Sequence, residues 1–120
     1  MSEEMERAIK KMVEQVFEYI NDLAETVDDA KRVLTHNADD FVIRVDKYGD
    51  DIYIKPFIDA NMYLREIKVP SLDKIGEYVA KAKWEWLYDM VEHMDYLVDR
   101  ITVLIVQIRA LTKLEDKKEG

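Results

Sequence analysis

Apolar side chains recur every three or four residues along two long stretches of the chain, the spacing that keeps one face of an α-helix apolar. The longer stretch follows Pro70-Ser71, and its apolar positions are Leu72, Ile75, Val79, Ala82, Trp86, Met90, Met94, Leu97, Ile101, Leu104, Ile108 and Leu111. No Gly or Pro interrupts this stretch after Gly76. The pattern predicts one amphipathic helix over residues 72–115, about 65 Å long at 1.5 Å per residue.

The first stretch predicts a second long helix, over residues 3–36, with apolar positions at Met5, Ile9, Met12, Val16, Ile20, Leu23, Val27, Ala30 and Leu34. Ser2 is placed to cap its N-terminus, and Glu3, Glu4 and Glu6 follow where the helix dipole favours acidic side chains. Thr26 and Asp29 match a capping box, so a break and restart at Thr26 is an alternative to a continuous helix. The apolar register passes this point without a slip, which favours the continuous helix.

Between the two helices the hydrophobic period changes to two, which is typical of β-strands. We predict strands over residues 41–46, 51–57 and 62–69. Gly49 lies in the first turn, where a hairpin often requires a positive φ angle. Pro56 indicates that the second strand ends there or lies at an edge. A short helix is an alternative for the third segment, because Met62, Leu64 and Glu66 are good helix formers.

The predicted fold class is therefore α+β, with two long amphipathic helices flanking a three-stranded antiparallel β-meander in the order α-β-β-β-α. Residues 1–120 are expected to form a single domain. A sheet this small needs one face covered, and only the helices can cover it. We expect an antiparallel helical hairpin with the sheet at or near one end. We also expect an elongated shape, because the second helix is much longer than the ~14 Å radius of gyration of a compact chain of this size.

Charge and composition narrow the function classes. The net charge is −8, and residues 1–40 carry 11 acidic against 5 basic residues. A chain with a pI near 4.8 lacks the basic surface that binds phosphate backbones, so direct nucleic-acid binding is disfavoured. The longest apolar run, Val103 to Val106, is far shorter than the ~20 residues of a membrane span. There is no cysteine and no signal-peptide pattern, so we expect a cytoplasmic protein.

One group of side chains has the residue types of a metal site. Glu85, Asp89, Glu92 and His93 fall on neighbouring turns of the second helix, but no second histidine follows at the spacing that helix-borne metal sites use. A solvated acidic face is the better interpretation. The three glycines are too scattered to form a phosphate-binding loop. We expect no cofactor, no metal and no enzymatic activity.

A second apolar stripe occurs on the far side of the second helix, at Val103, Val106, Ala110 and Leu114. A helix that is apolar on two sides is normally buried on both, and a chain of this length has little left to cover the second side. We interpret this stripe as a self-association surface of a homo-oligomer, most simply a dimer. The alternatives are that the other helix or the sheet covers it, or that its exposure is tolerated.

Two further sets of side chains suggest contacts with a partner. Trp84 and Tyr88 lie four residues apart, off the main apolar stripe, and we expect them to pack against the sheet, with partner contact as the alternative. An acidic stripe follows the outer face of the first helix at Glu14, Glu18, Asp22 and Glu25. Like charges at this spacing repel, so the stripe either keeps the protein soluble or docks a basic protein.

The order of long helix, small β-meander and long helix is similar to the general layout of prefoldin-type chaperone subunits. This resemblance implies a holdase chaperone, although the apolar section near Val103 is unlike a solvated coiled-coil arm. A third interpretation is an acidic mimic that occupies a nucleic-acid-binding protein. Both are alternatives to the main interpretation, which is a non-catalytic interaction or scaffold protein that acts as a homo-oligomer.

Overall fold

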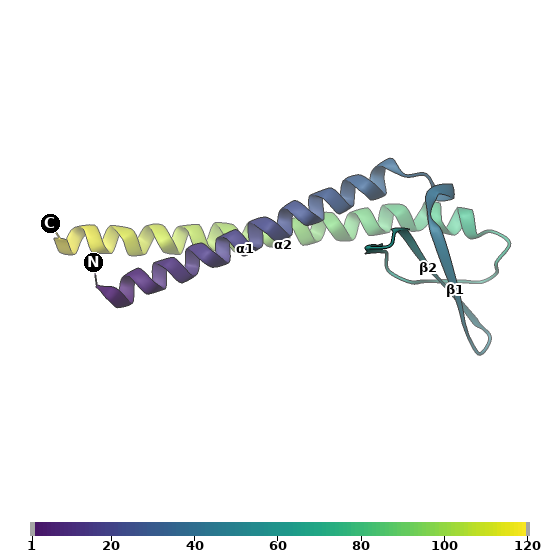
Figure 1. Ribbon diagram of the computed structural model, residues 1–120, viewed down its shortest axis with the longest axis horizontal. Helices are drawn as coiled ribbons and strands as arrows, with labels where there is room; N and C mark the ends of the chain where they lie inside the picture. Colours follow the sequence, from purple (N-terminus) through teal and green to yellow (C-terminus); the bar gives the residue numbers. More distant parts are fainter. Residues whose placement is uncertain (1, 120) are drawn as a thin grey trace. The chain divides into compact units, whose positions relative to one another are not determined.

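The computed structural model describes the backbone of residues 2–119 and the side chains of residues 2–114. Within these residues the elements follow in the order α1 (Glu3–Thr35), the 3-10 helix η1 (Ala38–Asp40), β1 (Val42–Tyr48), β2 (Asp51–Asp59), β3 (Met62–Tyr63), β4 (Ile67–Val69) and α2 (Ile75–Glu119) (Figure 1). Two long helices flanking an antiparallel sheet confirm the α+β class. The described sheet has one strand more than the predicted meander.

Backbone contacts group the chain into two compact units. Unit 1 contains Met1–Thr26 and His93–Gly120, so it is built from the N-terminal part of α1 and the C-terminal part of α2. Unit 2 is the continuous segment Val27–Glu92, which contains the end of α1, the sheet and the start of α2.

Helix α1 begins and ends with polar contacts that its sequence supplies. The backbone N–H of Met5 donates to Ser2 Oγ at 3.2 Å, which confirms the predicted cap. The helix continues through Thr26, whose hydroxyl donates to the Asp22 carbonyl at 2.9 Å instead of capping a new helix. At the other end, Lys83 Nζ donates to the His36 carbonyl at 2.7 Å, so a side chain of α2 satisfies a carbonyl just beyond the last turn of α1.

The hairpin of β1 and β2 is regular over its whole length. Seven antiparallel pairs run from Val42 opposite Phe57 to Tyr48 opposite Asp51. Gly49, in the connecting turn, has a φ of 66°, as predicted for a tight hairpin. Strand β1 lies at an edge, because β3 and β4 both pair with the other side of β2.

The predicted third strand is interrupted. β3 pairs with the C-terminal part of β2, with a register shift between Phe57 and Asp59, and β4 pairs with the segment from Ile52 to Ile54. Pro56 lies between these two ladders, in the middle of a central strand, so the expectation of a strand end or an edge was wrong. Its lack of an N–H is tolerated because no strand pairs with it on that side, while its carbonyl accepts from the Leu64 N–H at 2.9 Å.

The core of unit 2 lies between one face of the sheet and the two helices, as the small size of the sheet required. Ile54 of the central strand is fully buried, and Trp86 of α2 packs on Phe41 with ring centroids 6.0 Å apart. The buried cluster is completed by Val33, Met62, Leu64, Val69, Val79 and Ala82. Three members of the predicted apolar stripe of α2, Val79, Ala82 and Trp86, are thus core residues.

Helix α2 starts three residues later than predicted, at Ile75. The first helical hydrogen bond of this region runs from the Tyr78 N–H to the Lys74 carbonyl at 3.2 Å. Leu72 therefore lies in the preceding loop and is exposed, so it does not belong to the apolar stripe of the helix.

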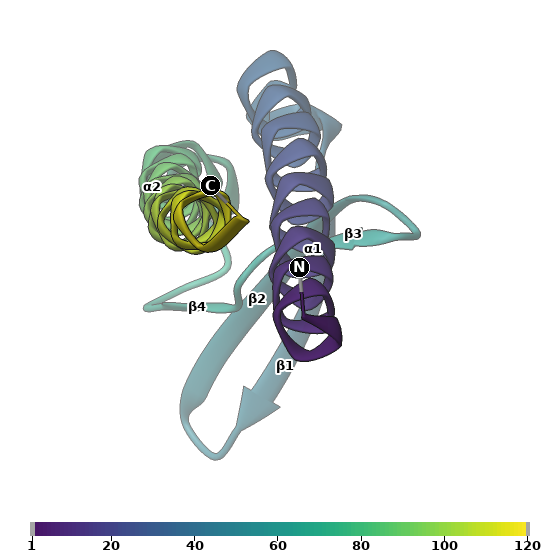
Figure 2. The same ribbon diagram turned by 90° about the vertical axis from the view of Figure 1, so that its left-hand side faces the viewer.

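Unit 1 has a much thinner core. Its two helical segments lie side by side and run in opposite directions, with the N- and C-terminal ends close together (Figures 1 and 2). Among its described side chains, Leu97 and Leu104 of α2 are buried, whereas the apolar side chains of α1 that face them are at most half-buried.

Trp84 and Trp86 provide a matched test of the unit 2 core. Replacing Trp86, which is 3% exposed, by Ala should lower the free energy of unfolding by about 3–5 kcal/mol through the cavity that it leaves. Replacing Trp84, which is 66% exposed, should change it by no more than about 0.5 kcal/mol. Equilibrium urea denaturation measures both values, and equal losses would contradict the assignment of Trp86 to the core.

Candidate interaction surfaces

The stripe predicted on the far side of α2 is exposed within unit 1. Val103, Val106, Ala110 and Leu114 are all exposed, and Val106, which is 61% exposed, lies on the side of α2 opposite to Leu97 and Leu104. Within the described residues of unit 1, the segment of α1 does not cover these side chains. Tyr96 lies seven residues before Val103, so the same face extends by one further heptad.

Sequence reasoning missed additional exposed apolar side chains in unit 1. Val98 and Ile105 lie on α2 seven residues apart, and Phe17 and Ile20 of α1 are also exposed, although Ile20 belongs to the predicted apolar stripe of that helix. A search for a period of seven would have found Val98 and Ile105, because seven residues are nearly two helical turns. The exposed half of α2 in unit 1 is therefore more apolar than the predicted stripe alone.

In unit 2, Trp84 and Tyr88 project into solvent, so the expectation that they pack against the sheet was wrong. Two residues along a helix are separated by 200°, and the sheet covers the side of α2 that carries Trp86. Val91, one heptad after Trp84, is also exposed. The Glu92 carboxylate accepts a hydrogen bond from the Tyr88 hydroxyl and raises the pKa of Tyr88 above its ordinary value.

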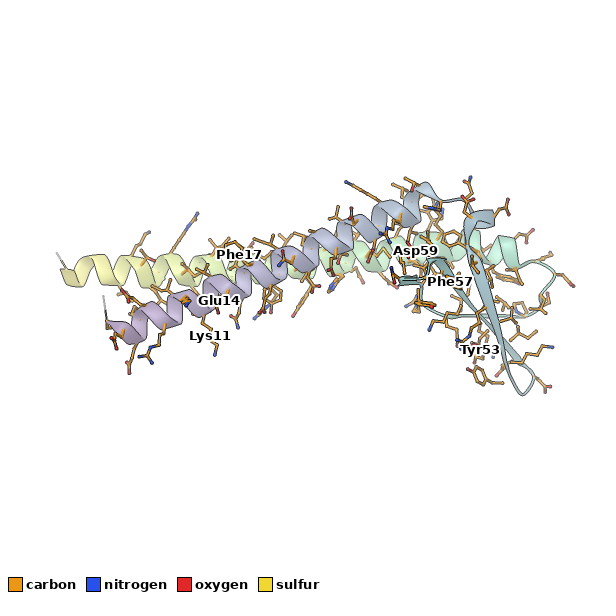
Figure 3. The ribbon with its side chains drawn as sticks, viewed as in Figure 1. Lys11, Glu14, Phe17, Tyr53, Phe57 and Asp59 are labelled. Carbon is orange, nitrogen blue, oxygen red and sulfur yellow. The ribbon has the colours of Figure 1, made fainter. Side chains whose placement is uncertain are left out.

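The four side chains of the acidic stripe of α1 are all exposed. Within the part of the chain whose side chains are described, none of Glu14, Glu18, Asp22 and Glu25 forms an ion pair. Figure 3 shows Glu14 on α1 together with the exposed Phe17. The stripe and the exposed apolar side chains of α1 are thus neighbours on one helix.

The acidic side chains with metal-site composition are engaged in other contacts. Arg65 pairs with Asp89 at 3.1 Å and lies 3.9 Å from Glu85, and the ring of His93 stacks on Tyr96. No group of three or more potential ligands in the described residues is arranged to hold a metal ion.

The outer face of the sheet carries aromatic side chains that sequence reasoning did not single out. Phe57 packs on Tyr63 with centroids 5.2 Å apart, Tyr53 packs on Tyr48 at 5.5 Å, and the ammonium group of Lys55 lies 5.3 Å from the Tyr63 ring (Figure 3). The alternation of Tyr53, Lys55 and Phe57 along β2 was visible in the sequence, because alternate residues share a face of a strand.

The edge strand β1 carries one ion pair on this outer face. Arg44 and Asp46 are two residues apart, and the Asp46 carboxylate accepts from Arg44 Nε at 3.1 Å. This contact raises the pKa of the Arg44 guanidinium above its ordinary value.

A pocket of about 180 Å³ lies in unit 2, between β4 and the first turns of α2. It is lined by Ile67, Lys68, Tyr78, Lys81, Ala82 and Glu85. Small-molecule sites usually measure about 300–1,000 Å³, so this pocket gives little support to a substrate site.

Comparison with known proteins gives no family, since no family model, no curated protein and no solved structure matches the chain. Neither described helix has a stretch long and apolar enough to cross a membrane. The surfaces themselves are therefore the basis for a functional proposal.

The acidic stripe predicts a measurable self-repulsion. Glu18 stands four residues from both Glu14 and Asp22, so Glu18→Lys converts two repulsive pairs into attractive ones and should stabilise the protein by about 1 kcal/mol at low salt. Glu18→Gln should give about half of this gain. Thermal denaturation at low and high salt measures the effect, which should shrink as salt screens the charges. A loss of stability at low salt in both variants would contradict it.

Proposed function

We propose that this chain is a non-catalytic scaffold protein that assembles with a second copy of itself through the exposed apolar face of α2 in unit 1. This self-association face comprises Tyr96, Val103, Val106, Ala110 and Leu114. The exposure of Val106 and its neighbours, on a helix whose opposite side is already buried, is the observation that carries the proposal.

The core of unit 1 is thin, because only Leu97 and Leu104 are buried among its described side chains. Two antiparallel helices cover only one side of each other, and the most economical way to cover the remaining apolar side is a second helix pair, as in a four-helix bundle. Among the described side chains of unit 1, eight large apolar ones are exposed: Phe17, Ile20, Tyr96, Val98, Val103, Ile105, Val106 and Leu114. They lie on more than one side of the helix pair, and a second helix pair can cover those on the self-association face, Tyr96, Val103, Val106 and Leu114.

The spacing of the face supports helix-to-helix packing. Tyr96, Val103 and Ala110 repeat every seven residues, Val106 falls between the last two, and Leu114 follows Ala110 by four residues, which resembles the seam of a coiled coil. Ala110 is small, which permits close approach of two helices. A two-fold axis through this face would place the same residues of both copies in contact.

Glutamates on the self-association face should separate the copies. In Val103→Glu with Val106→Glu, each copy would bury two carboxylates without partners, which should raise the dissociation constant at least ~100-fold. The control is Thr102→Glu with Thr112→Glu, which adds the same charges at exposed polar positions of the same helix outside the heptad positions of the face. Sedimentation equilibrium measures the mass of each variant, and a parent that is itself monomeric would refute the proposal.

An aggregation assay, together with the mass of the parent, distinguishes the scaffold from the chaperone interpretation. A holdase uses exposed apolar surface to bind unfolded chains, so a monomeric parent that suppresses the aggregation of an unrelated unfolded protein would favour the prefoldin-like function. A dimer with no such activity would favour the scaffold.

The acidic stripe of α1 provides a second contact in this proposal, for a basic protein. Poly-L-lysine serves as the probe, and its binding should weaken steeply between low and high salt. Glu14→Gln with Glu18→Gln should reduce the low-salt affinity, whereas Asp89→Asn with Glu92→Gln, on α2, removes the same charge and should have less effect. Equal losses of affinity in the two variants would show that poly-L-lysine responds only to the net charge of the protein and not to the acidic stripe.

A further inference from the structure

The free edge of β1 is the second surface that a single copy leaves without a partner. No strand of the described chain pairs with β1 on the side away from β2. The strand is seven residues long, contains no proline and pairs with β2 without a bulge. Figure 1 shows the turn of the hairpin of β1 and β2 pointing away from the start of α2. Such an edge is a template for pairing with another strand.

The backbone groups on this edge can be assigned from Pro56. Its carbonyl accepts from Leu64 and therefore points away from β1. Backbone N–H and C=O groups alternate in direction along a strand, so those of Lys55 and Phe57 point toward β1. There they pair with the backbone groups of Arg44 and Val42, respectively. It follows that Ile43, Val45 and Lys47 direct their N–H and C=O groups to the free edge.

The side chains of β1 select one register for pairing with an identical strand. In an antiparallel pair related by a two-fold axis through Val45, Arg44 of each copy faces Asp46 of the other copy. Val42 faces the second copy's Tyr48, and Val45 faces Val45. Opposite charges and apolar pairs directly across a ladder are favourable. Every N–H and C=O that Ile43, Val45 and Lys47 direct to the edge also finds a partner.

The neighbouring two-fold registers are unfavourable. An axis through Arg44 would place two guanidinium groups opposite each other, and an axis through Asp46 would do the same with two carboxylates. Like charges at such positions are destabilising. Charged side chains often protect an edge strand from pairing. Here, in the register centred on Val45, each charged residue of the pair Arg44 and Asp46 faces the opposite charge of the second strand.

We propose that β1 forms a two-fold antiparallel contact with β1 of a second copy, in the register centred on Val45, which joins the two sheets edge to edge. The exposed apolar side chains of the strand, Val42, Val45 and Tyr48, are all covered in this arrangement. This contact lies on unit 2 and is separate from the self-association face of α2.

A single cysteine tests the register directly, because the chain has none of its own. Facing residues of a hydrogen-bonded antiparallel pair have Cα atoms about 5.5 Å apart, within the range of a disulfide. Val45→Cys should therefore give a disulfide-linked dimer on mild oxidation. Val42→Cys is the control: it is 54% exposed against 41% for Val45, but its copies would lie about 20 Å apart. Equal cross-linking at both positions, or none at Val45, would overturn the proposal.

Charge exchange tests the pairing without a cross-link. Arg44→Asp and Asp46→Arg each place like charges across the ladder twice, and each should weaken association ~10-fold or more. The double exchange, Arg44→Asp with Asp46→Arg, restores both opposite pairs and should return the dissociation constant to within about threefold of the parent. A double exchange no tighter than the single variants would refute the register.

These measurements are made on the full chain carrying Val103→Glu and Val106→Glu, so that the α2 contact does not contribute. Failure of the α2 contact would leave the Val45 cross-link unchanged, whereas failure of the β1 contact would abolish it. Thermal denaturation of each variant separates loss of pairing from loss of folding.

Discussion

The packing of α2 against one face of the sheet is the interaction on which unit 2 depends. Four short or medium strands cannot form a stable layer without cover, and Val79, Ala82 and Trp86 provide it over Ile54. The contact between Lys83 and the His36 carbonyl joins the end of α1 to the same surface of α2. This arrangement covers one face of the sheet only, so the outer face, with Tyr53 and Phe57, and the edge strand β1 stay open to solvent.

The features that could be predicted from the sequence are those set by neighbouring residues. The Ser2 cap, the turn at Gly49 and the burial of Trp86 depend on local chemistry or on a regular period, and all three were predicted. The interruption between β3 and β4 depends on the register shift of β2 near Phe57, which is a tertiary feature. The prediction for Trp84 was wrong because a large aromatic residue suggests burial, whereas the sheet covers only the opposite side of α2.

Both candidate surfaces exist because a single copy of the chain has too few helices and strands to cover them. Unit 1 has two helices where a closed bundle has four, and β1 is an edge strand with one free side. The stripe on α2 could be recognised in the sequence as a second set of apolar residues at helical spacing. The free edge of β1 could not, because the order of strands in the sheet is not contained in any local sequence pattern. A subunit with two different two-fold contacts forms either a closed assembly or an extended chain, according to the angle between the two axes.

The two tryptophans also have a practical consequence for spectroscopy. They lie two residues apart on α2, one in the apolar interior with an indole N–H that finds no acceptor in the described chain, and one largely in water. Indole emission shifts to longer wavelength as its surroundings become more polar. The native protein therefore carries one shielded and one solvent-exposed fluorophore within a single helical turn.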